Sequence, residues 1–95
     1  MENEQHFFYV LLCKDGSLYA GYTNNLDRRI RLHNEGKGAK YTRGRTPLTL
    51  LYAKQFTSKS EALKAEYHFK QLPRQKKLAL IRNETGDNNV AAKKL

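Results

Sequence analysis

The chain has 95 residues, 39% of them hydrophobic and 28% charged, which suits one folded domain and excludes two independent ones. Its formal net charge of +9 favours nucleic acid as a partner, and its single cysteine, Cys13, excludes an intramolecular disulfide and a cysteine-rich zinc site. No apolar run approaches the roughly 20 residues that cross a bilayer. The acidic residues 1–5 do not resemble a secretory signal, so a cytoplasmic protein is expected.

The first third of the chain predicts a β-hairpin followed by a helix. Strands are expected at residues 7–13 and 17–22, joined by Asp15 and Gly16, a dipeptide typical of tight hairpin turns. The segment 24–36 begins with two asparagines, which are good N-caps, and ends with a glycine, which favours a stop. We therefore expect a helix of about three turns within it.

The rest of the chain predicts a loop, a strand and two helices. Glycines and basic residues indicate a loop at 36–47, and strand-forming residues indicate a third strand at 48–53. Residues 58–61 (Ser-Lys-Ser-Glu) have the form of a capping box, so a second helix begins there. Pro73 suits the first position of a third helix, which is expected to end near Ile81.

Basic residues are concentrated between residues 28 and 45, where Glu35 is the sole acidic residue. This density would attract a phosphate backbone and release its counterions on binding, which predicts a nucleic-acid partner. A solvated surface and a contact with an anionic membrane remain as alternatives. The residues expected to bind nucleic acid are Arg28, Arg31, Lys37, Lys40, Tyr41, Arg43 and Arg45.

Four side chains in the first third of the chain are candidates for chemistry. Tyr9 and Tyr19 fall on the two hairpin strands, where tyrosines most often serve as half-buried packing residues. Arg29 and His33 are four residues apart on the predicted helix and therefore share one face. That pair would suit a phosphate clamp, and the alternative is an arginine and a histidine that are simply exposed.

Glu66 is a further candidate because of its position on the second helix. It lies among Ala62, Ala65 and Phe69, on the side that the helical periodicity assigns to the core. A carboxylate there needs a partner, because an unpaired buried charge is costly. The partner is either an arginine in a structural salt bridge, or a divalent metal or reacting phosphate.

Together these residues resemble the motifs of the GIY-YIG nuclease superfamily. The first motif is represented by residues 7–9 (Phe-Phe-Tyr), which keep the tyrosine, and the second by residues 19–21 (Tyr-Ala-Gly). Residues 15–19 and 36–42, the latter reading Gly-Lys-Gly-Ala-Lys-Tyr-Thr, are similar to the small stand-alone bacterial branch. The resemblance spans roughly residues 7–82.

The resemblance implies an α+β domain with a three-stranded antiparallel sheet flanked by about three helices. The domain would occupy residues 5–82, and residues 83–95 would be a polar, disordered tail. The tyrosines, arginine and glutamate would converge on one face of the sheet. The implied catalytic residues are Tyr9, Tyr19, Arg29, His33 and Glu66. The late asparagine of the family is not assigned to a residue of this chain.

The implied activity is that of a metal-dependent endonuclease that hydrolyses phosphodiester bonds in DNA, in repair or nucleic-acid processing. Glu66 would hold Mg²⁺ or Mn²⁺, and Tyr9 would help to activate the attacking water, with nearby arginines lowering its pKa. Tyr19 would orient water or phosphate, and Arg29 would neutralise developing charge. His33 would assist proton transfer or hold the scissile group, and the assignment of the base among Tyr9, Tyr19 and His33 stays open.

Two other classes of function remain open. One is a nucleic-acid-binding module of the same fold with weak or no cleavage, acting through a protein partner that supplies specificity. The other is a protein-interaction domain whose basic face binds an acidic partner. Competition with single-stranded and duplex DNA would separate this last class from the first two.

Overall fold

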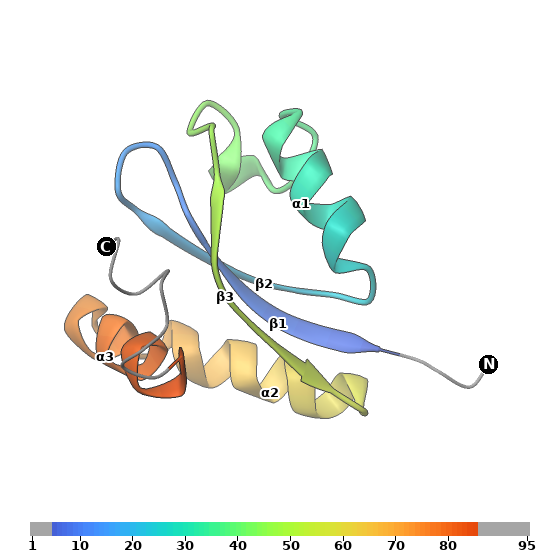
Figure 1. Cartoon of the computed structure of the whole chain (residues 1–95), viewed down its shortest axis with the longest axis vertical. Coiled ribbons are helices and arrows are strands. Elements are labelled where there is room, and N and C mark those ends of the chain that lie inside the picture. Colours follow the sequence, from blue (N-terminus) through green and yellow to red (C-terminus); the bar gives the residue numbers. More distant parts are fainter. Residues whose placement is uncertain (1–4, 86–95) are drawn as a thin grey trace.

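The chain folds as a three-stranded antiparallel sheet with helices on both faces. The computed structural model describes residues 5–85. The central strand β1 (His6–Leu12) pairs on one side with β2 (Leu18–Thr23) and on the other with β3 (Thr49–Phe56), as Figure 1 shows. Both pairings are antiparallel. The predicted sheet is therefore confirmed, and β3 runs three residues beyond its expected end.

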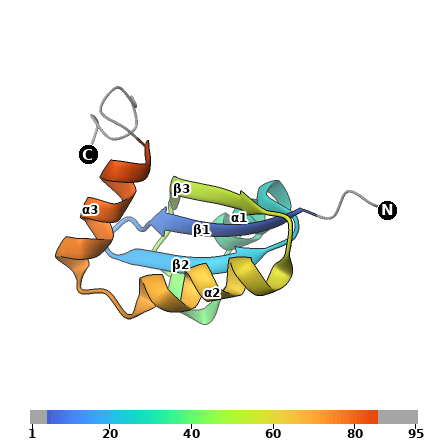
Figure 2. The ribbon, with the colours of Figure 1, turned by 90° about the horizontal axis from the view of Figure 1, so that it is seen from below.

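One helix covers one face of the sheet and two helices cover the other. Figure 2 shows α1 (Leu26–Asn34) on the opposite side of the sheet from α2 (Lys59–Lys70) and α3 (Arg74–Thr85). A single-turn 3-10 helix (Lys40–Thr42) interrupts the loop between α1 and β3. The predicted α+β class with three helices is confirmed.

Alternation along β1 builds a separate core on each face of the sheet. Phe8 and Val10 pack with Phe69 of α2 on one side. Tyr9 and Leu11 form the other cluster, against which α1 packs. The tyrosine of the first motif therefore belongs to the α1 side of the sheet.

Local sequence signals explain where the elements begin and end. The Asn25 side chain caps α1 by accepting from the Arg28 amide, and Ser58 caps α2 in the same way. The helix α3 begins at Arg74, one residue after Pro73, and it continues to Thr85 rather than ending near Ile81. Residues 86–95 of the predicted tail lie outside the described part of the chain.

No helix in residues 5–85 has both the length and the apolar character needed to span a membrane.

Candidate active site

A chain of hydrogen bonds joins β1, α1 and the following loop in the interior of the α1 side. The Tyr9 hydroxyl lies 2.9 Å from His33 Nε2, and His33 Nδ1 lies 2.8 Å from Thr42 Oγ1. Thr42 Oγ1 in turn donates to the Ala39 carbonyl at 2.8 Å. The side chains of Tyr9, His33 and Thr42 have no exposed surface.

Two glycines make room for this chain of hydrogen bonds. Gly21 is the cross-strand partner of Tyr9, and a Cβ at Gly21 would lie 2.6 Å from the Tyr9 hydroxyl oxygen. A Cβ at Gly38 would overlap the His33 ring around Nδ1. The glycine of the second motif therefore allows the tyrosine of the first motif to lie across β2.

His33 is held in its neutral form at physiological pH. Its pKa is lowered to about 4, chiefly by burial and in addition by the nearby charge of Arg29. The alternative of an exposed His33 is wrong, since the ring is fully buried, and in this position the ring does not reach a phosphate at the surface. A neutral imidazole next to a tyrosine hydroxyl is instead suited to accept a hydrogen bond from it.

Tyr9 has a pKa raised to about 12, chiefly because burial disfavours the phenolate. The expected net lowering of this pKa is therefore wrong, although the arginine acts in the expected direction. Arg29 does oppose the effect of burial through a hydrogen bond to the Tyr9 hydroxyl, while Tyr19 and Glu66 raise the pKa electrostatically. Tyr9 alone is a poor base in this environment, and its contact with His33 gives its proton a destination.

Arg29 joins the two tyrosines of the candidate site. Its guanidinium hydrogen-bonds to the hydroxyls of both Tyr9 and Tyr19. Tyr19 is half-buried, and its ring packs against His33 with centroids 5.2 Å apart. The structure thus brings together the four candidate residues of the first third of the chain on the α1 side of the sheet.

Glu66 comes from the opposite side of the sheet, so the four residues and the glutamate do not share one face as expected. It lies on α2 with 18% of its side chain exposed and forms an ion pair of 2.9 Å with Lys70, one turn later in the same helix. Its predicted need for a partner is met by this lysine rather than by an arginine. Its charge nevertheless raises the pKa of Tyr9, so the carboxylate lies near the group formed by Tyr9, Tyr19, Arg29 and His33, called the tyrosine cluster below.

A cleft at the exposed edge of β2 links the two sides of the sheet. It has a volume of about 320 Å³ and is lined by Tyr19 and Tyr41 from the α1 side and by Lys70 and Lys77 from α2 and α3. Apolar side chains of β2 and α2 complete its lining. A phosphate in this cleft could reach two cations and a tyrosine of the cluster, close to Glu66.

The basic loop, the segment between α1 and β3, borders this cleft and contacts the hairpin turn. Tyr41 stacks on Tyr19 with ring centroids 5.9 Å apart, and the Arg45 guanidinium lies 4.3 Å from the centre of the Tyr41 ring. Arg45 also pairs with Asp15, whose carboxylate caps the turn through the Ser17 amide. Tyr41 is 43% exposed, so part of it remains open to a nucleic-acid base.

The other residues expected to bind nucleic acid are exposed on α1 and on the loop. They are Arg28, Arg31, Lys37, Lys40 and Arg43. Of these, Lys37 lies 3.9 Å from the Glu35 carboxylate. Their exposure leaves them open to phosphate, as the sequence pattern predicts.

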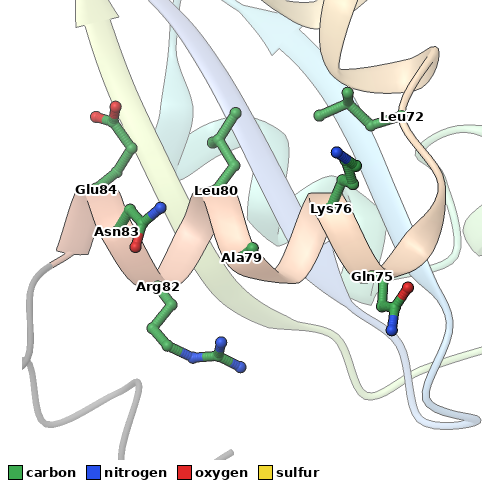
Figure 3. A pocket seen from close by; sticks show the side chains of 8 residues that line it. All are labelled: Leu72, Gln75, Lys76, Ala79, Leu80, Arg82, Asn83 and Glu84. Atoms are coloured by element: carbon green, nitrogen blue, oxygen red, sulfur yellow. The ribbon is translucent and has the colours of Figure 1, made fainter.

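Asn83 is the sole asparagine after Glu66 in the described part of the chain. It lies on α3 and lines a hollow of about 660 Å³ with Lys76, Ala79 and Arg82, shown in Figure 3. None of the tyrosine cluster lines this hollow. Asn83 therefore does not supply the late asparagine expected beside the site.

Three residues near the site were not among the candidates from sequence. Lys70 could have been identified from its spacing of four residues from Glu66, which is typical of helical ion pairs. For Thr42 and Lys77, no pattern in the neighbouring sequence indicates that they lie near the site. Thr42 contacts His33 because the glycine-rich loop folds back, and Lys77 reaches the cleft because α3 follows α2 in space.

Comparisons with known proteins give one family. The family whose model matches is described as the GIY-YIG catalytic domain, and the match covers residues 5–79. The chain is 65% identical over 77 residues to a UPF0213 protein of Bacillus velezensis, covering 81% of this chain and 78% of that protein. It is 58% identical, over the same shares of both chains, to the UPF0213 protein YazA of Bacillus subtilis.

Two solved structures are also similar. The solution NMR structure of a UPF0213 protein from Bacillus halodurans has a TM-score of 0.61 at 49% identity, over 96% of both chains. That of a protein from E. faecalis has a TM-score of 0.59 at 46% identity, over 93% of this chain and 96% of that one. Both similarities extend across nearly the whole chain.

Proposed function

Because this chain belongs to the GIY-YIG family of nuclease domains, we propose that it is an endonuclease that hydrolyses phosphodiester bonds in DNA with a divalent metal ion, Mg²⁺ or Mn²⁺. The observation that carries the proposal is the cleft at the β2 edge. It brings Tyr19, the exposed end of the tyrosine cluster, next to Lys70, the ion-pair partner of Glu66. Phosphate-binding groups line this cleft, and the other two sets of groups lie one contact behind it. Tyr9 and His33 pack against Tyr19, and Glu66 pairs with Lys70.

Tyr9 and His33 would act as a proton-accepting pair. The attacking water gives a proton to the Tyr9 oxygen as the Tyr9 hydroxyl proton passes to His33 Nε2, 2.9 Å away. The hydroxide attacks phosphorus, the bond to the leaving oxygen breaks, and that oxygen takes a proton from solvent. This route avoids a free phenolate, which the raised pKa of Tyr9 makes costly, and it requires the low pKa of His33 to rise when Arg29 turns to the phosphate.

Arg29 would control access to this pair. In the free protein it hydrogen-bonds to both tyrosine hydroxyls, and Tyr9 has no exposed surface. A phosphate that draws the guanidinium toward itself would uncover Tyr9. It would also remove part of the positive charge that lowers the pKa of His33, and so strengthen His33 as the acceptor. Arg29 then neutralises charge on the reacting phosphate.

Glu66 fits a metal that keeps most of its own waters. Within residues 5–85 no three His, Cys, Asp or Glu side chains gather into a cation site, so a complete protein cage is not built here. Mg²⁺ is commonly held by one or two carboxylates together with substrate phosphates, which matches Glu66. When bound, the metal would polarise the phosphate and stabilise the leaving oxygen. Lys70 would release Glu66 and turn to the phosphate.

The test is cleavage of labelled single-stranded, duplex and flapped DNA, and of RNA, with Mg²⁺, Mn²⁺ or EDTA. Glu66→Gln should abolish cleavage while binding by fluorescence anisotropy persists. Glu61→Gln is the matched control, because Glu61 lies on the same helix but is exposed and sits in its capped first turn. A preference for the flapped substrate would support a role in repair or processing.

Two results would contradict the proposal. Binding to DNA without cleavage under any metal would indicate a nucleic-acid-binding module instead, a function that the complete burial of Tyr9 and the Glu66–Lys70 ion pair would suit. Cleavage that persists in Glu66→Gln would remove Glu66 as the metal ligand. Lack of binding to any nucleic acid would point to an acidic protein partner.

A further inference from the structure

We propose that Thr42 is a positioning residue for the proton acceptor: its hydroxyl fixes the tautomer of His33 so that the unprotonated Nε2 faces Tyr9. The proposal rests on the proposed function, because it assigns His33 as the acceptor in that reaction. It gives the loop between α1 and β3 a part in the chemistry in addition to binding nucleic acid.

The number of available protons decides the tautomer. A threonine hydroxyl has one proton, and Thr42 donates it to the Ala39 carbonyl, which can only accept. In the contact of 2.8 Å with His33, Thr42 must therefore accept, so Nδ1 carries the imidazole proton. A neutral imidazole has one N–H, which leaves Nε2 as the acceptor of the Tyr9 hydroxyl proton.

Burial strongly favours this tautomer of His33 over the other. His33 and Thr42 both have no exposed surface, so solvent does not replace Thr42 as the acceptor for Nδ1. The ring cannot retreat either, because the backbone at Gly38 passes close to Nδ1 and leaves no room even for a Cβ. Loss of the Thr42 hydroxyl would strand a buried N–H, which favours the other tautomer. In that tautomer Nε2 carries a proton and cannot accept one from Tyr9.

The backbone around Thr42 holds its hydroxyl in place. The Thr42 amide donates to the Ala39 carbonyl at 3.0 Å, and the Arg45 amide donates to the Thr42 carbonyl at 3.1 Å. The Arg45 carbonyl in turn accepts from the Lys14 amide in the hairpin turn at 2.8 Å. The short turn that carries the basic side chains is thus tied to the sheet that carries Tyr9.

The experiment compares Thr42→Val with Thr42→Ser. Valine keeps the shape of threonine without the hydroxyl, and serine keeps the hydroxyl without the methyl group. Nitrogen-15 NMR of the imidazole, at a pH well above the His33 pKa and with His33→Gln for assignment, reports which ring nitrogen is protonated. Cleavage kinetics on the same proteins give kcat and KM, and backbone amide spectra check the fold.

We expect wild type and Thr42→Ser to give the Nδ1–H signature and similar kcat. Thr42→Val should shift the ring toward Nε2–H and lower kcat by about tenfold or more, with KM little changed. An unchanged Nδ1–H signature in Thr42→Val would overturn the proposal, as would equal losses of kcat in both variants. A wild-type protein that does not cut would remove the proposed function, while NMR would still decide whether Thr42 sets the tautomer.

Discussion

Gly21→Ala tests whether the spacing between β2 and Tyr9 is required for both stability and cleavage. Gly21 does not have a positive φ angle, so alanine suits its backbone conformation and the effect is purely steric. The added Cβ would lie 2.6 Å from the Tyr9 hydroxyl oxygen and 2.7 Å from Cζ. Carbon atoms in contact prefer about 3.5–4.0 Å, so the ring must move by roughly 0.8 Å or more.

The movement has two expected costs. A shift of that size along the hydrogen bond would stretch the distance between the Tyr9 oxygen and His33 Nε2 from 2.9 Å to about 3.7 Å, which is no longer a hydrogen bond. Because Tyr9 is fully buried, its neighbours must also yield, and overpacking of this kind costs about 1–3 kcal/mol of unfolding free energy. Misplacement of a reacting group by about 1 Å can lower kcat about 100-fold.

Urea unfolding followed by circular dichroism measures the stability, and cleavage of the preferred substrate measures kcat. Ala53→Ser is the control, because Ala53 is the partner of Tyr9 on β3, is exposed, and also gains one heavy atom. The control should resemble wild type in both measurements. If Gly21→Ala kept wild-type stability and kcat, the close packing of Tyr9 on Gly21 would have no functional weight.

Three further predictions follow from the same contacts. The folded pKa of His33, about 4, lies below its unfolded value of about 6.5. The unfolding free energy should therefore fall as the pH drops from about 6.5 toward 4, with a slope approaching about 1.4 kcal/mol per pH unit. Urea titrations at a series of pH values would show this fall, and His33→Gln should flatten the slope. Lys77→Ala should weaken DNA binding and reduce the slope of log K against log salt concentration by about one, whereas Lys64→Ala, in a separate hollow on α2, should do neither. Fluorescence anisotropy with labelled DNA at a series of salt concentrations measures both quantities. Asn34→Ala should lower stability by about 1 kcal/mol in urea unfolding, because its amide donates to and accepts from the backbone just before β3; an unchanged midpoint would show that these bonds contribute nothing.

The fold was predictable because its signals are local. Asp15 and Gly16 specify the hairpin turn, and Asn25 and Ser58 specify the starts of α1 and α2. The expected end of α3 near Ile81 was wrong because it followed the apolar period and not such a local signal. No glycine or proline follows Ile81 until residue 86, so nothing in the sequence stops the helix at the point where its apolar period ends.

The environment of His33 could not be predicted because it depends on contacts between distant segments. Helical spacing correctly places Arg29 and His33 on one face. It does not reveal that Gly38 allows the loop to close over His33, or that Thr42 then reaches Nδ1. The pKa of Tyr9 was misjudged for the same reason, since the arginine is visible in the sequence whereas the burial that outweighs it is not.

The division of the site between the two faces of the sheet constrains how a substrate can bind. The tyrosine cluster lies under α1, and Glu66 lies on α2 on the other face of the sheet. The two sets of groups therefore approach each other at the edge of β2, where the cleft lies. A nucleic-acid strand that contacts both sets of groups has to run past the edge of β2, across the cleft between Tyr19 and Lys77. The basic loop ends beside this cleft, where Tyr41 stacks on Tyr19. The basic side chains of the loop would then bind the strand on one side of the reacting phosphate, and Lys70 and Lys77 would bind it on the other. Substitutions of these basic residues should weaken binding, whereas substitutions that disturb the Tyr9–His33 pair or remove the Glu66 carboxylate should lower kcat with little change in KM.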